Sequence, residues 1–270
     1  VDAFFSKLSE NECSEWRWNW NLWGRQAQRA PRGDWRIWLV MAGRGFGKTR
    51  AGAEWVRHVA ERDGKARIAL VAANLGEARR VMVEGESGIL AVSTPPPPLW
   101  LPSLRRLEWA NGARAEIFSA ADPESLRGPQ HSHGWCDELA KWETAAESAD
   151  RTWDNYQMGL RLGAHPHTLI TTTPKNVPLL RRLLESPDLV VTRGRTEENA
   201  DNLSPDFAAK MRALYGHSAL ARQELDGEML GDVEGSLWPR VRLDACRVAT
   251  PPLDSLTRVI VAVDPPAGHK

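Results

Sequence analysis

Short apolar runs of strand length alternate along this chain with segments that repeat apolar residues at helical spacing. Apolar runs of this kind are typical of strands that are buried on both faces of a parallel sheet. The predicted strands are 37–42, 66–73, 133–137, 167–173 and 189–195. The predicted helices between them are 50–62, 75–84, 143–162 and 178–185. This order predicts an α/β fold in which helices flank a central, mainly parallel sheet.

Three further stretches change this regular pattern. Four consecutive prolines, 95–98, exclude a helix or a central strand and predict a surface loop. Asn111 and Gly112 separate two alternating segments within 104–119, as in a β-hairpin. From 205 to 230 the pattern predicts two helices and therefore a small helical subdomain. A last apolar run, 257–264, predicts a strand that ends in a carboxylate.

Composition limits the class of protein. The 270 residues are 42% hydrophobic, which is enough for a packed core. Lys plus Arg and Asp plus Glu both number 35, so contact with nucleic acid must come from a local patch of charge. Cys13, Cys136 and Cys246 are widely spaced, which predicts a reducing compartment and no structural zinc. No apolar run approaches the ~20 residues of a membrane span, so we expect a cytoplasmic protein.

Tryptophan is abundant, with thirteen in the chain. Large aromatic side chains more often bury area than stack on a ligand, so we expect core packing in preference to base stacking. The expectation applies above all to the six that precede residue 40, which are Trp16, Trp18, Trp20, Trp23, Trp35 and Trp38.

The strand at 37–42 leads directly into a glycine-rich turn and then into a helix. This context favours a phosphate-binding loop, because glycines let the backbone turn its N–H groups toward phosphate oxygens at a helix N-terminus. Lys48 would supply charge to the outer phosphates, and the hydroxyl of Thr49 would ligate the accompanying Mg²⁺. Ala42 replaces the first glycine of the usual pattern. The loop itself is Gly43, Arg44, Gly45, Phe46, Gly47, Lys48 and Thr49.

Two adjacent acids, Asp137 and Glu138, follow the predicted strand 133–137. Ligands of open α/β sheets bind at the carboxyl ends of the strands. We expect Asp137 to hold Mg²⁺ and Glu138 to take the proton from the water that attacks the γ-phosphate. A kinase would not need a water-activating acid at this position, so the pair favours an NTPase.

Several other side chains are candidates that spacing alone does not decide. Arg44 and Arg127 could each stabilise charge on the transferred phosphoryl group, and Arg127 could face a neighbouring subunit. The hydroxyls of 171–173, at a strand end, suit a γ-phosphate sensor, or they simply fill a strand with β-branched residues. Gln28 carries an amide that could read adenine, although most glutamines are solvated.

Five motifs together resemble the large terminase subunit of tailed bacteriophages, in matching order and spacing. The resemblance covers nearly the whole chain from about Trp23. It implies that Gln28 contacts adenine, that Asp137 is the metal acid, that Glu138 is the catalytic base and that Thr171, Thr172 and Thr173 form a coupling motif. The motifs are GRGFGKTRAGAEW (43–55), SLRGPQ (125–130), WCDELAKWE (135–143), LITTTPK (169–175) and RQELDGEML (222–230).

The resemblance also implies a function and partners. It predicts an ATPase that binds ATP and Mg²⁺, assembles as a homo-oligomeric ring on the portal protein with the small terminase subunit, and drives double-stranded DNA into a procapsid in the host cytoplasm. Arg127 would then act as a finger in trans. The alternatives are another nucleic-acid ATPase, such as a helicase-like enzyme, and a degenerate prophage fragment that binds nucleotide without turnover.

In the same family, Asp264 looks like the first metal acid of an RNase H-like nuclease. A nuclease site of this kind needs further carboxylates to bind two metal ions, and none follows Lys270, so we expect that this chain does not cut DNA. We expect the chain to be either an engineered motor fragment or a truncated prophage gene product. The predicted domains are a P-loop ATPase domain (1–200), a helical lid or linker subdomain (201–235), and a linker with the first nuclease strand (236–270).

Overall fold

The computed structural model describes residues 8–142, 149–204, 206–216 and 218–230, with three further single positions at 238, 242 and 246. The chain divides into two compact units, Val1–Leu230 and Gly231–Lys270, and the fold below belongs to the first. The helical segment predicted for 205–230 is part of that unit. The strand predicted at 257–264, with Asp264, lies outside the described residues.

The first unit is built on an eight-stranded sheet with the order β3-β4-β5-β2-β6-β7-β1-β8. The bonded pairs from β5 to β8 are parallel, whereas β3, β4 and β5 pair antiparallel. The hairpin predicted around Asn111 and Gly112 is confirmed, since β4 pairs with β5. The strands are β1 (Ile37–Ala42), β2 (Arg67–Ala72), β3 (Leu99–Leu101), β4 (Arg106–Glu108), β5 (Arg114–Ser119), β6 (His133–Asp137), β7 (His167–Thr172) and β8 (Leu189–Gly194).

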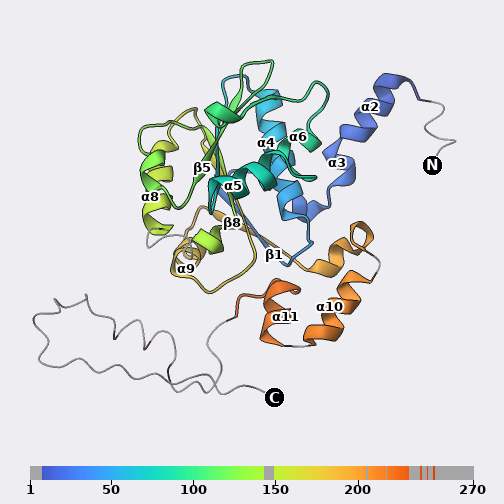
Figure 1. Cartoon of the computed structure of the whole chain (residues 1–270), viewed down its shortest axis with the longest axis vertical. Helices are drawn as coiled ribbons and strands as arrows, with labels where there is room; N and C mark the ends of the chain where they lie inside the picture. The colour runs from blue at the N-terminus through green and yellow to red at the C-terminus, as the bar shows by residue number, and fades with distance from the viewer. Residues whose placement is uncertain are drawn as a thin grey trace, which may run out of the picture. The chain divides into compact units, whose positions relative to one another are not determined.

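Helices cover both faces of the sheet (Figure 1). In β1 the side chains alternate, so that Trp38 and Val40 pack beneath α4 while Leu39 and Met41 pack toward α8 and α9. Both sides of β1 are therefore fully apolar, as the sequence predicted. The α-helices of the main body are α4 (Lys48–Arg62), α5 (Leu75–Glu77), α6 (Ile89–Val92), α8 (Ala149–Gly159) and α9 (Pro178–Leu184).

One predicted helix has a different geometry. The segment 75–84 begins as the short helix α5 and continues as the π-helix η2 (Ala78–Val83). Wider i→i+5 turns of this kind place Ala78, Met82 and Val83 in the core, while Val81 is partly exposed. The prediction of helix was right in position and wrong in type for its second half.

The tryptophan prediction holds for the strand region and fails for the N-terminal helices. Trp35 and Trp38 are buried, whereas Trp23 is 57% exposed and Trp16, Trp18 and Trp20 are half-buried. The reason is that α2 (Glu10–Trp18) and α3 (Trp20–Trp23) lie along the outside of α4 and not within the sheet core. No helix in the described ranges is long and apolar enough to cross a membrane.

The helical pair predicted near residue 205 is present as α10 (Phe207–Tyr215) and α11 (Ala219–Glu224). It follows the 3-10 segment η6 (Thr196–Asn202), which begins soon after β8 ends. A backbone bond from Arg44 to the Glu224 carbonyl (2.7 Å) connects α11 to the turn after β1, and one from Thr196 to the Leu225 carbonyl (2.8 Å) connects η6 to the end of α11. The pair is thus joined directly to the glycine-rich loop.

Candidate nucleotide-binding site

The glycine-rich turn between β1 and α4 adopts the backbone needed to surround an anion. Gly45 and Gly47 have φ values of 73° and 93°, in the left-handed region that favours glycine. Gly47 is the N-cap of α4, so the helix N-terminus opens onto the turn. Phe46 is fully buried, and its ring packs so closely on Gly194 that a Cβ there would lie 2.1 Å from it. The ring anchors the tip of the loop to β8.

Lys48, the predicted phosphate lysine, is buried within this turn. Its Nζ donates to the carbonyls of Ala42 (2.9 Å) and Gly43 (3.1 Å) and to Thr173 Oγ1 (3.1 Å). Burial lowers the pKa of Lys48, while the charges of Glu138 and Asp137 oppose that shift. The hydrogen-bond partners of the ammonium are therefore neutral oxygens, and the nearest carboxylate, of Glu138, lies 3.8 Å away.

The predicted metal acid, Asp137, ends β6 in a buried hydrogen-bond chain. Trp135 Nε1 donates to Thr171 Oγ1 at 2.8 Å, and that hydroxyl donates to Asp137 Oδ1 at 2.6 Å. Burial, and then the neighbouring charge of Glu138, raise the pKa of Asp137 to about 7. A buried carboxylate is costly to ionise on its own, so a neighbouring dication stabilises its charged form strongly.

Glu138, the predicted base, has a strained backbone with φ 46°. This conformation turns the carboxylate back over the sheet edge, where Oε2 accepts the Thr173 N–H at 3.3 Å and Oε1 lies 3.8 Å from Lys48 Nζ. Thr172 Oγ1 donates to the Thr173 carbonyl and accepts the Ala140 N–H. The structure therefore brings Lys48, Asp137, Glu138 and 171–173 together, as the strand order β6-β7-β1 requires.

The donor types at this edge suit magnesium. Mg²⁺ prefers hard oxygen ligands and is usually bound through one or two protein groups together with substrate phosphates and water. The Asp137 carboxylate is one such group, and Thr49, the second residue of α4, carries the predicted hydroxyl. No group of three or more His, Cys, Asp or Glu within the described residues could hold a metal ion by itself.

Gln28 and Arg25 approach the loop from the N-terminal side. Gln28 Nε2 donates to the carbonyls of Phe46 (3.2 Å) and Gly47 (3.3 Å), and its Oε1 accepts the Arg25 N–H (3.2 Å). The Arg25 guanidinium lies 4.8 Å from the centroid of the Phe46 ring and donates to the Phe46 carbonyl at 2.5 Å. The sequence predicts that Gln28 contacts adenine, and the structure places its side chain against the loop. Arg25 was not among the residues that the sequence singled out.

Arg44 projects from the loop toward the helical pair. Its Nε donates to Glu224 Oε2 of α11 at 2.5 Å, and its side chain is 68% exposed. The hydrogen bond and charge of Glu224 raise the pKa of Arg44. Glu224 is a residue that sequence reasoning missed, although the motif 222–230 contains it.

Arg127, the other candidate arginine, lies elsewhere. It follows the 3-10 segment η4 (Pro123–Leu126), its side chain is 64% exposed, and its Nη1 is paired with Glu124 at 3.1 Å. Gly128 follows with φ 108°, which turns the chain sharply at this point. The structure thus presents Arg127 on the surface.

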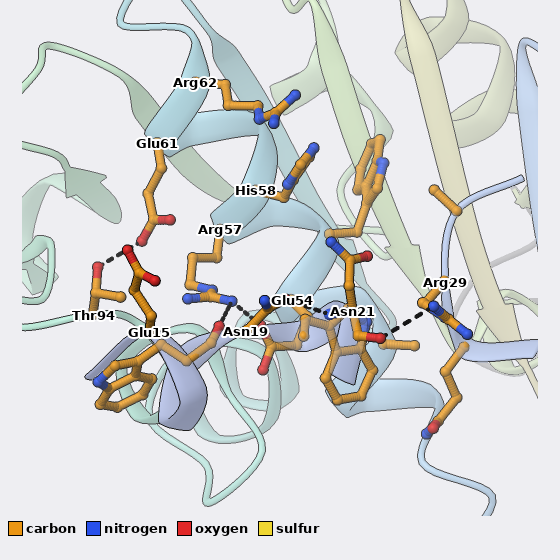
Figure 2. A pocket seen from close by; sticks show the side chains of 16 residues that line it. Glu15, Asn19, Asn21, Arg29, Glu54, Arg57, His58, Glu61, Arg62 and Thr94 are labelled. Carbon is orange, nitrogen blue, oxygen red and sulfur yellow. Dashed lines mark hydrogen bonds and ion pairs between the residues drawn. The ribbon is translucent and has the colours of Figure 1, made fainter. Parts of the chain in front are cut away.

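A groove of about 500 Å³ lies between the N-terminal helices and α4 (Figure 2). Arg57 Nη2 donates to the Trp18 carbonyl (2.8 Å), and the buried carboxylate of Glu54 lies 2.7 Å from both Arg57 and Arg50. Arg50 in turn lies over the ring of Trp20, 5.5 Å from its centroid. These contacts dock α2 and α3 on the helix that follows the loop.

The family of this chain follows from its match to a known family model. The model of the family described as "Terminase large subunit, T4likevirus-type, N-terminal" matches residues 39–244. The chain belongs to this family. No curated protein matches the terminase chain.

Solved structures share the fold of this terminase chain. The large terminase ATPase domain of Thermus phage P74-26 is 18% identical with a TM-score of 0.52, over 74% of this chain and 90% of that one. The large terminase of a thermophilic bacteriophage, in complex with ADP, is 13% identical with a TM-score of 0.59, over 81% of this chain and 53% of that one. The HK97 bacteriophage large terminase is 13% identical with a TM-score of 0.52, over 74% and 47%. The chain therefore spans most of an isolated ATPase domain and about half of the full-length terminases.

Proposed function

We propose that this chain hydrolyses ATP at the glycine-rich loop and that the hydrolysis drives double-stranded DNA into a procapsid. The observation that carries the proposal is the contact set at the sheet edge, where the Lys48 ammonium, the Asp137 carboxylate and the Glu138 carboxylate converge on one loop. Family membership assigns that loop to a terminase. The thermophilic phage terminase structures in complex with ADP and ATP-gamma-S support nucleotide binding by this fold.

Each group of residues at the loop has a separate role in binding or hydrolysis. The amides of 43–49 and the Lys48 ammonium bind the phosphates, and Thr49 with Asp137 holds Mg²⁺, which neutralises phosphate charge when bound. Glu138 takes the proton of the attacking water. Gln28 contacts adenine, for which its Oε1 keeps one lone pair beyond the bond from Arg25.

Thr172 and Thr173 contact the γ-phosphate, so that its presence or absence changes the end of strand β7. The Thr173 N–H already bonds Glu138, and its hydroxyl bonds Lys48, so this residue contacts both the base and the phosphate lysine. Arg44 and Arg127 are the two candidates for stabilising transition-state charge. Arg44 lies in the loop, and the exposure of Arg127 suits a role in a neighbouring subunit.

We further propose that the chain works as a homo-oligomeric ring with portal protein and small terminase subunit, in the host cytoplasm. The helical pair α10 and α11 couples hydrolysis to movement, because α11 bonds the loop through both the side chain and the carbonyl of Glu224. Helix shifts and hinge movements of elements that contact a ligand are known forms of such coupling.

The experiment measures ATPase rate and strand separation by the purified chain with and without double-stranded DNA. DNA-stimulated hydrolysis without strand separation, abolished in Lys48→Ala, is the expected result. Strand separation would favour a helicase-like enzyme, and nucleotide binding without turnover would favour a degenerate fragment. Either of these results would overturn the proposal.

A further inference from the structure

The outer side of the glycine-rich loop is held by side chains from distant parts of the chain. The carbonyl of Arg44 accepts from Thr196 Oγ1 (2.6 Å), and that of Gly45 accepts from Asn199 Nδ2 (2.6 Å). The next two carbonyls, of Phe46 and Gly47, accept from Arg25 and Gln28. Consecutive carbonyls of the loop are therefore all engaged from outside.

This arrangement has a consequence for the amides. The peptide group is planar and trans, so the carbonyl of one residue and the N–H of the next point in opposite directions. Fixing the carbonyls of 44–47 outward turns the N–H groups of 45–48 toward the inside of the loop. Within the loop the Phe46 N–H makes only a long bond, 3.4 Å, to the Gly43 carbonyl. The inward amides form an anion-binding concavity.

Asn199 is the residue that joins these contacts into one network. Its Nδ2 binds the Gly45 carbonyl, while its Oδ1 accepts from the guanidinium of Arg25 and from Asn202 Nδ2 (3.0 Å). The side chain is buried, with 9% exposed. Within η6 the Asn199 backbone departs from helical geometry, with φ −116°. A carboxamide carries a donor and an acceptor on one planar group, which this position uses at the same time.

We propose that Asn199 is a positioning residue for nucleotide binding, which holds the Gly45 peptide so that the loop keeps its phosphate-binding shape. The inference rests on the proposed function of the loop. Asn199 acts through the loop backbone and not through the base or the reacting phosphate. Loss of the Asn199 side chain should therefore lower the affinity for every nucleotide by the same factor.

The test measures the dissociation constants of ADP, ATP and GTP by calorimetry, together with kcat and KM, for the parent and two variants. Asn199→Ala removes the bonds to the Gly45 carbonyl, to Arg25 and to Asn202. It should raise each dissociation constant by roughly tenfold, since the Gly45 carbonyl loses its donor and the half-buried Arg25 keeps only its bond to the Phe46 carbonyl. At saturating ATP, kcat should change by less than about threefold, because transition-state contacts remain.

Asn199→Asp keeps the volume and the pairing with Arg25 but sets a carboxylate oxygen against the Gly45 carbonyl. It should weaken binding more than Asn199→Ala does. Because the substitution is isosteric, it also serves if the alanine variant does not fold, as judged by thermal unfolding. Asp201→Ala is the matched control, since Asp201 is exposed on the same turn and should leave all constants unchanged.

Three outcomes would overturn the inference. These are unchanged ADP affinity in both Asn199 variants, a loss confined to adenine nucleotides, and a fall in kcat with unchanged dissociation constants. If the parent itself bound no ADP, the proposed function would fail instead, so the two failures are distinguishable.

Discussion

Arg44 Nε of the glycine-rich loop and Glu224 Oε2 of α11 lie 2.5 Å apart. A loop arginine that would face the outer phosphates of a nucleotide is therefore bonded to the helical pair. If Arg44 contacts a bound phosphate, as proposed, the phosphate and the Glu224 carboxylate would compete for the same guanidinium. Binding of nucleotide would then weaken the bond between the loop and α11.

Replacement of Glu224 tests this competition. Glu224→Ala should tighten ADP binding a few-fold, because Arg44 no longer has to leave a partner. The free energy of unfolding should fall by no more than about 1 kcal/mol, since the Arg44 side chain is largely exposed. Calorimetry and urea unfolding measure the two effects, with Glu228→Ala, at an exposed acid on the same segment, as control. Weaker ADP binding in Glu224→Ala would show that the carboxylate supports the loop.

Glu138→Gln should separate binding from hydrolysis. The metal acid Asp137 and the lysine Lys48 remain, so affinity for ATP with Mg²⁺ should be retained, while turnover falls by roughly 10²-fold or more because the proton acceptor is lost. Phosphate release over time and equilibrium binding are measured on the same preparation. Residual turnover equal to that of the parent would place the base elsewhere.

Arg127 can be tested by complementation between two inactive proteins. If Arg127 serves a neighbouring subunit, a mixture of Glu138→Gln with Arg127→Ala should hydrolyse ATP faster than the sum of the two proteins alone. Each chain then completes the site of the other, and a supplied arginine is worth roughly 10³-fold or more in related systems. Activity per subunit of the parent should also rise with concentration. A mixture that never exceeds the sum under assembling conditions would leave Arg44 as the candidate.

His133 makes stability depend on pH. Burial, and then the charge of His167 stacked 5.9 Å away, lower the pKa of His133 to about 4 from 6.5. The unfolded chain thus binds a proton that the folded chain excludes between these values. The free energy of unfolding should fall as pH falls from 6.5 toward 4, by at most about 3 kcal/mol from this residue.

The His133→Gln variant should flatten that part of the pH profile, as measured by urea unfolding at several pH values. Burial also lowers the pKa of His131 to about 4, so the variant would keep the part of the pH dependence of stability that comes from His131. His165→Gln is the control, since this ring is exposed at the same end of the sheet. A profile in His133→Gln that matches the parent would contradict the assignment.

The sequence predicted most of the α/β body because strands buried on both faces leave continuous apolar runs, as in β1 and β2. It did not predict the π-helix η2, since the apolar spacing of 78–83 fits an ordinary helix equally well. Nor did it place Trp23 on the surface. Apolar content alone does not tell a core helix from one docked outside it.

For the site, local motifs predicted the loop and the acids, and strand order then brought them together. The residues that support the loop were not found, because their contacts link positions far apart in sequence without any fixed spacing. Asn199 and Gly45 are 154 residues apart, and Arg44 and Glu224 are 180 apart. Short polar side chains in a loop after β8 resemble ordinary surface residues until the fold is known.

The family match begins at residue 39, after the two N-terminal side chains that hold the carbonyls of Phe46 and Gly47. A recombinant fragment trimmed to that boundary would keep the five motifs from 43 to 230, yet it would lose Gln28, Arg25 and the start of β1, and with them the bonds to the carbonyls of Phe46 and Gly47. The segment that sequence similarity marks therefore omits side chains that hold the loop in this fold. For expression and assay, the smallest useful piece of this terminase begins before Arg25.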